Sequence, residues 1–199
     1  MDLRRLATFG GAIGPAAFVS TWVVAGRRSD GYAPLDDAIS RLAASGAPTR
    51  RLMTAGFTCL GVTLSAFAYL RRDALGATGS TSALVSGLAT LGAGFTSLER
   101  SPASDAAHLA CAVIGYATLS AAPALAAGPL RRHGHPRLAA VAPAAAVLSG
   151  LSLAATAWGP KRGLFQRVGL TLGDAWLAAT ALSLLVRDER VAQAAPATA

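Results

Sequence analysis

The chain has 199 residues, of which 53% are hydrophobic and only 14% are charged, and its formal net charge is +8. In soluble domains roughly a quarter of the residues are charged. The charged residues of this chain are too few to cover the surface of a soluble globule. The composition excludes a soluble enzyme, a disulfide-rich secreted domain and a disordered chain.

Six apolar runs divide the chain. They cover residues 6–26, 52–70, 74–98, 106–130, 138–160 and 168–186, and a charged residue falls only in the last, at Asp174. A helix needs about 20 apolar residues to cross the hydrocarbon core, so each run is long enough or nearly so. Short links make successive spans antiparallel. We therefore predict an all-α polytopic membrane protein, an up-and-down bundle of six transmembrane helices.

The polar stretch between the first two runs is too long for a simple connector. Pro34 can open a helix, and Asp36, Asp37 and Ser40 follow it with helical spacing. This pattern predicts a short surface helix over residues 34–44, folded over the mouth of the bundle. We expect Asp36 or Asp37 to pair with Arg167 or another arginine on that face, because unpaired charges are unfavourable near lipid.

Arginine pairs flank the apolar runs, and their density is higher on the side of the N-terminus. Basic residues at helix ends contact anionic lipid, so membrane lipids are the expected partners and nucleic acid is not. The charge bias predicts a multi-pass plasma membrane protein with both termini cytoplasmic. We expect residues 1–187 to form one transmembrane domain and residues 188–199 a disordered polar tail.

Most of the other polar residues gather in three loops that share the predicted outer face. Asp105 and His108 are three residues apart and share one face of a helix. A carboxylate beside an imidazole is the smallest unit for proton transfer. The alternative is that Asp105 caps the fourth helix and that His108 bonds to a neighbouring loop.

Asp174 stands alone inside the sixth run. A charge at that depth costs several kcal/mol unless it is paired or hydrated, so it marks a functional site by default. Arg167 lies seven residues earlier on the same helix face. A structural tie or a protonated carboxyl that faces the bundle is the alternative.

Three stretches carry a resemblance to a known family: residues 31–43, a polar turn that ends in Asp105-Ala-Ala-His108, and Gly163-Leu-Phe-Gln-Arg167. They resemble those of an uncharacterised prokaryotic membrane protein family, domain of unknown function 998, over roughly residues 6–187. In that family the third turn usually reads Phe-Pro-x-Asp, where this chain has Phe95-Thr-Ser-Leu-Glu99. The resemblance implies a six-span bundle of unproven activity. It extends distantly to the Frag1/DRAM/Sfk1 membrane proteins, which are linked to lipid handling.

The first functional expectation is an integral membrane protein of the cell envelope whose outer polar pocket binds a lipid headgroup or a similar amphiphile. The residues expected in this pocket are Tyr32, Asp36, Asp37, Ser40, Asp105, His108, Gln166 and Arg167. One alternative is a lipid hydrolase or transferase that uses Asp105 and His108 as acid and base. Another is a small proton-coupled transporter that uses Asp174. An accessory subunit or a homo-oligomer stays open, and no cofactor or metal is expected.

Overall fold

The computed structural model describes residues 2–158 and 160–194. These residues form six α-helices and one short 3₁₀ helix, with no strand among them. The elements are α1 (Leu3–Arg27), η1 (Ile39–Ala43), α2 (Arg50–Leu70), α3 (Arg72–Phe95), α4 (Pro102–Arg132), α5 (Pro136–Ala155) and α6 (Arg162–Ala194). The predicted all-α class is confirmed, and each apolar run forms most of one helix.

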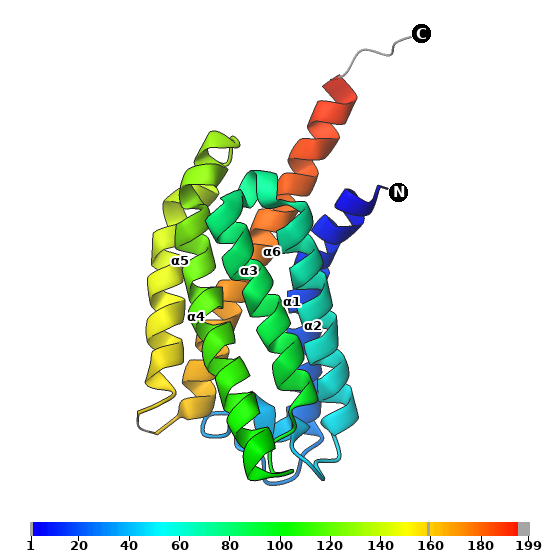
Figure 1. Ribbon diagram of the computed structural model, residues 1–199, viewed down its shortest axis with the longest axis vertical. Helices are drawn as coiled ribbons and strands as arrows, with labels where there is room; N and C mark the ends of the chain where they lie inside the picture. The colour runs from blue at the N-terminus through cyan, green and yellow to red at the C-terminus, as the bar shows by residue number, and fades with distance from the viewer. Residues whose placement is uncertain (1, 159, 195–199) are drawn as a thin grey trace.

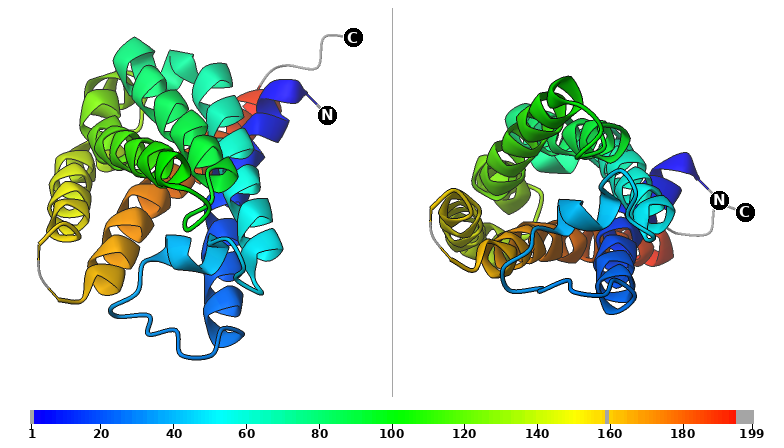
Figure 2. Two further views of the ribbon diagram at one scale, coloured as in Figure 1. Left: turned by 60° about the horizontal axis from the view of Figure 1, so that its bottom comes forward. Right: turned by 90° about the horizontal axis from the view of Figure 1, so that it is seen from below.

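The six α-helices form a ring in which each helix packs against the next one, and α6 closes the ring against α1 (Figure 2). α4 and α6 also touch each other. The start of α1 and the end of α6 lie together at one end of the bundle, which we call the terminal end (Figure 1). The loop end, opposite, holds the α1–α2, α3–α4 and α5–α6 links.

Five of the helices, α1, α2, α4, α5 and α6, are long and apolar enough to cross a membrane. Large apolar side chains also cover the outside of the bundle. Ile13, Val62, Leu109, Val147 and Leu151 are each more than half exposed. An apolar exterior of this kind suits lipid and would be unfavourable in water. The chain is therefore a multi-pass integral membrane protein.

The helix α3 differs from the other five because its sequence is rich in hydroxyl residues. Its Ser80 and Ser82 hydroxyls donate hydrogen bonds of 2.7 and 2.8 Å to the carbonyl oxygens of Ala68 on α2 and Thr118 on α4. Hydroxyl groups that bond neighbouring helices are tolerated inside a membrane bundle. The helix of the span predicted over residues 74–98 is therefore not among the five that are apolar enough to cross a membrane.

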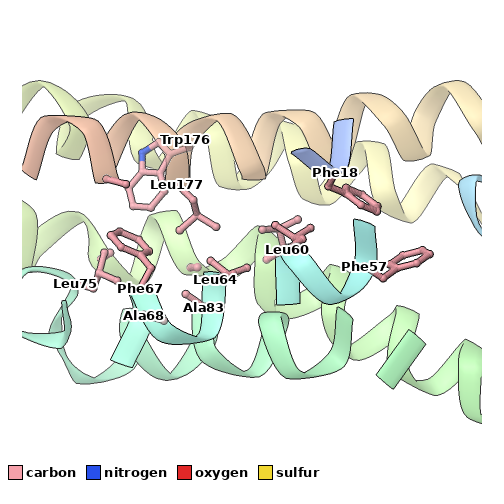
Figure 3. Packing of buried hydrophobic residues seen from close by; sticks show 14 of the residues in the cluster. Phe18, Phe57, Leu60, Leu64, Phe67, Ala68, Leu75, Ala83, Trp176 and Leu177 are labelled. Carbon is pink, nitrogen blue, oxygen red and sulfur yellow. The ribbon is translucent and has the colours of Figure 1, made fainter. Parts of the chain in front are cut away.

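The core runs along the inner faces of α2 and α6. Phe57, Leu60, Leu64 and Phe67 of α2 lie along one side of it, and Trp176 and Leu177 of α6 lie opposite (Figure 3). The ring of Phe18 on α1 lies 5.1 Å from that of Phe57. Since lipid is as apolar as these side chains, the cluster stabilises the bundle mainly by close packing.

Loop one forms a smaller helix than the one predicted over residues 34–44. Only the five residues of η1 are helical, and the Ile39 and Leu42 side chains are buried. The segment before η1 consists of turns. Burial of these two side chains pulls the segment into the mouth of the bundle, so it does not lie on the surface as an α-helix.

The helix α6 continues past the predicted boundary at residue 187 to Ala194. Asp188 pairs with Arg71, which is fully buried, and Glu189 pairs with Arg5 at 2.5 Å. These ion pairs join the last turns of α6 to α1 and to the α2–α3 corner. Residues 195–199 of the predicted tail lie outside the described residues.

Candidate functional site

A small cavity lies inside the ring, between α1, α2, α3, α4 and α6. Its volume is about 50 Å³, room for about three water molecules. Most of its lining is apolar, and the polar lining residues are Ser40, Ser86, Thr90, His108, Tyr116, Gln166 and Asp174. The cavity therefore combines an apolar wall with a few polar groups contributed by different helices.

A second, larger space of about 580 Å³ lies beside the cavity, along α4, α5 and the start of α6. Exposed apolar residues such as Leu109, Val113 and Trp158 line it, so it opens on the outer surface of the bundle. We call it the lateral groove. Its volume is within the usual range for pockets that hold small molecules.

The cavity and the lateral groove share part of their lining. The residues that line both are Ser40, His108, Ala112, Tyr116 and Gln166. Four of these five side chains are polar, although the groove itself is mostly apolar. Polar groups therefore lie where the two spaces meet.

His108 is held by the end of α3. The side chain is buried, and its Nδ1 lies 3.0 Å from the carbonyl oxygen of Ala93 and 2.7 Å from that of Thr96. Because both partners are acceptors, Nδ1 carries the ring proton. The last carbonyl groups of a helix lack partners within it, and His108 supplies one for α3. In the neutral ring, Nε2 is the acceptor that is left for another group.

Gln166 fixes loop one and α4 to the start of α6. Its Oε1 accepts a 2.7 Å hydrogen bond from the backbone N–H of Ile39, and its Nε2 donates a 2.5 Å bond to the Tyr116 hydroxyl. The amide is thus used at both ends. Tyr116 was not among the predicted site residues because a lone tyrosine in an apolar run has no distinguishing pattern.

Arg167 does not line the cavity or the groove. Its Nη1 donates to the carbonyl oxygens of Pro34 at 2.5 Å, Asp37 at 3.1 Å and Gly163 at 2.9 Å. The guanidinium also lies 5.2 Å from the centre of the Trp22 ring. Arg167 is buried, and its Nη1 donates to backbone oxygens where contact with a lipid headgroup was predicted. The Arg167 side chain therefore holds loop one against the start of α6.

Tyr32 makes a further contact between Arg167 and loop one. Its hydroxyl accepts a hydrogen bond from Arg167 Nη2 and lies 3.2 Å from the carbonyl oxygen of Ala38. Burial raises the pKa of the phenol above its usual value, while the Arg167 charge acts in the opposite direction. Tyr32 therefore stays neutral and bridges Arg167 to loop one.

The two loop-one aspartates have different surroundings. Asp37 pairs with Arg41 at 2.5 Å and accepts a 2.9 Å bond from the Ala33 N–H, which fits the expected pairing with an arginine on this face. Asp36 is exposed. Neither of these aspartates lines the cavity or the groove.

Asp105 and His108 are not joined in the structure. The Asp105 Oδ1 accepts a 2.8 Å hydrogen bond from the backbone N–H of Glu99, and thereby closes the turn before α4. His108 bonds to the end of α3 instead. The structure thus agrees with the alternative in which His108 bonds to a neighbouring segment, whereas the cap of α4 is Ser101 and not Asp105.

Asp174 is 2% exposed and lines the cavity. Its Oδ2 has no hydrogen-bond partner among residues 2–158 and 160–194. Arg167, on the same helix, is engaged by loop one and does not line the cavity. Asp174 is therefore a buried carboxyl beside a space large enough for water.

No curated protein and no solved structure matches the chain. A family model does match, over residues 12–183, and its description is "Protein of unknown function (DUF998)". The match covers most of the chain, including all six helices in whole or in part. The chain therefore belongs to the DUF998 family of proteins of unknown function.

Proposed function

We propose that all six α-helices cross the plasma membrane, with both termini in the cytoplasm. α3 is kinked at Gly76, and its uninterrupted part from there to Phe95, about 19 residues, is long enough for a crossing and lies between α2 and α4 in the ring. The test is cysteine accessibility in whole cells, after replacement of Cys59 and Cys111. Ser101→Cys should react from outside, and Arg72→Cys, at an exposed position of the α2–α3 corner, only after the membrane is permeabilised. The reverse pattern would contradict the orientation, and labelling of both from the same side would contradict a crossing by α3, the one that five apolar helices leave open.

The protein, on this proposal, binds a lipid or a similar amphiphile from the surrounding bilayer. The observation that carries it is the shared lining of the lateral groove and the cavity by His108, Tyr116 and Gln166. The apolar groove suits an acyl chain, and the polar junction suits hydrogen-bonding atoms of a headgroup. Acid–base hydrolysis is less favoured, because Asp105 caps a turn and does not contact His108.

The test is mass spectrometry of the lipids that co-purify with the protein. Ala154→Phe places a ring in the lateral groove, whereas Ala144→Phe adds the same ring to an exposed position of α5 outside the groove. The first variant should lose a lipid species that the wild type and the second variant retain. Equal lipid content in all three proteins would overturn the proposal.

His108→Gln examines the headgroup end of the same site. Glutamine retains a donor that can bond to the carbonyl oxygens of Ala93 and Thr96, but it lacks the imidazole Nε2. The variant should bind the co-purified lipid more weakly while it unfolds at nearly the same temperature. His133→Gln is the matched control, since His133 lies at the terminal end. Equal loss in both variants would separate the binding from this site.

Asp174 supports a second candidate, a small proton-coupled transporter. A carboxyl that lines an internal cavity and has an unpartnered oxygen among the described residues is suited to take up and release a proton. Carbodiimide reagents react with protonated carboxyls in apolar surroundings, so they should label Asp174 and label it less as the pH rises. The exposed Asp36 is the internal control. Labelling that does not change with pH would rule out a proton-carrying role.

A further inference from the structure

A separate groove of about 670 Å³ lies at the terminal end, between the start of α5 and the last turns of α6. Its walls combine arginines with large apolar side chains. The arginines are Arg137, Arg187 and Arg190, and the large apolar residues are Leu138, Leu182 and Val186. No acidic residue lines it among the described residues. We call it the basic groove.

Three acidic side chains of this end are already paired elsewhere, and a fourth, Asp2, caps α1. Asp73 pairs with Arg4, Asp188 with Arg71 and Glu189 with Arg5. Within the part of the chain that the structure describes, the three arginines of the basic groove make no ion pair. The positive charge of this groove is thus left for a partner outside the chain.

His135 gives a second, independent observation, a buried polar atom without a partner among the described residues. The side chain is only 7% exposed and lines the groove. Its Nδ1 lies 2.8 Å from the Ser183 hydroxyl, while its Nε2 has no hydrogen-bond partner among the described residues. The pKa of this imidazole is lowered, mainly by burial and to a smaller extent by the charge of Arg187. The ring is therefore neutral near pH 7. When Ser183 donates to Nδ1, Nε2 carries the proton and can donate to an anion.

The backbone at this point also favours an anion. α5 begins at Pro136, which has no N–H, and the Ala139 N–H bonds to the His135 carbonyl oxygen, so the N–H groups of Arg137 and Leu138 are left without a partner in the helix. Gly134, with φ of +81°, precedes this turn, and a Cβ built there would lie 2.0 Å from Arg187 Nη1. The absence of a side chain at Gly134 makes room for the Arg187 guanidinium beside the start of α5.

We propose that the basic groove binds an anionic phospholipid from the leaflet at the terminal end. The phosphate would be held by Arg187, Arg190 and the start of α5. An acyl chain would follow Leu182 and Val186, which are about half exposed on α6. Charge and apolar surface are adjacent in this groove, so its chemistry suits a charged headgroup attached to a chain better than a free anion.

The test measures lipid binding to the full chain in detergent by native mass spectrometry, with phosphatidylglycerol and phosphatidylcholine as probes. The wild type should retain phosphatidylglycerol in preference to phosphatidylcholine. Arg187→Gln with Arg190→Gln should weaken phosphatidylglycerol binding about tenfold or more, since charge-assisted bonds to phosphate are lost. Arg131→Gln with Arg132→Gln is the matched control, because these exposed arginines lie at the same end outside the groove.

Three outcomes would overturn the proposal. Equal weakening in both double variants would show general attraction between basic residues and lipid. Equal binding of the two lipids by the wild type would show that charge is not recognised. Full competition by inorganic phosphate would show that a free anion is the ligand. The single variant Arg190→Gln distinguishes a loss of binding from misfolding. Since Arg190 is exposed, this variant should bind phosphatidylglycerol more weakly without a change in thermal stability.

Discussion

The guanidinium of Arg71 is fully buried and donates hydrogen bonds to the carboxylate of Asp188, 117 residues further along the chain. It also donates a 3.4 Å hydrogen bond to the Thr8 hydroxyl of α1. Arg71 lies at the corner between α2 and α3, and Asp188 lies near the end of α6. The Arg71 side chain therefore links α1 and α6 to the corner between α2 and α3.

Asp188→Asn should destabilise the protein because it removes the charge that compensates buried Arg71. Breaking a buried pair leaves an unpaired charge, but Asp188 is half exposed, so we expect a loss of about 1–3 kcal/mol. Glu189→Gln breaks the exposed pair with Arg5 and should change stability by roughly 0–1 kcal/mol. Thermal unfolding in detergent checks the difference, and equal midpoints for the two variants would contradict it.

Arg167→Lys should loosen loop one. Lysine has one nitrogen, so it cannot bond both to the loop-one carbonyl oxygens, as Nη1 does, and to the Tyr32 hydroxyl, as Nη2 does. The expected loss is about 1.5–3 kcal/mol, with faster tryptic cleavage within residues 28–49 of the folded protein. Arg162→Lys, at an exposed position of the same helix, is the control. Unchanged cleavage of loop one in Arg167→Lys would mean that the hydrogen bonds of Arg167 do not hold loop one in place.

The helices could be predicted from the sequence because length and apolarity are local properties of the chain. The exact nature of loop one could not, since Ile39 and Leu42 are buried by helices distant in sequence. The end of α6 was missed for a similar reason. Asp188 and Glu189 look like residues of a solvated tail until their partners Arg71 and Arg5 are known.

The candidate site was predictable only in part. His108 and Gln166 stand out as polar residues at helix starts, and both line the shared junction. The partners of His108 are the backbone carbonyl groups of Ala93 and Thr96. Every residue has such a group, so the sequence does not indicate which ones bond to His108. Arg167 was expected to face a ligand, but its Nη1 donates hydrogen bonds to backbone oxygens of loop one. Sequence spacing identifies which polar groups share an end of the bundle, while packing decides which of them stay free.

The stability of the protein should fall in mild acid because of His135. Its pKa is lower in the folded chain than in the unfolded one, so the unfolded chain binds more protons below about pH 6.5. Stability is therefore full above that pH and decreases as the pH falls toward the folded pKa. His135→Asn should flatten the change in unfolding temperature between about pH 7 and pH 5.5, and His133→Asn should not. An unchanged slope in His135→Asn would exclude His135 as its cause.

Gly76→Ala should destabilise the corner where α3 begins to pack on α4. Gly76 has φ of +71°, a backbone conformation that alanine rarely adopts, and a Cβ there would lie 2.4 Å from Cγ of Pro129. Strain of this kind costs about 1–3 kcal/mol. Gly128→Ala is the matched control, since Gly128 is helical and exposed and its Cβ would come no nearer than 3.5 Å to Arg132 Nη1. Because alanine favours the helix, that variant should unfold at the wild-type temperature or slightly above it. Equal unfolding temperatures for Gly76→Ala and Gly128→Ala would show that the contact between Gly76 and Pro129 does not constrain the bundle.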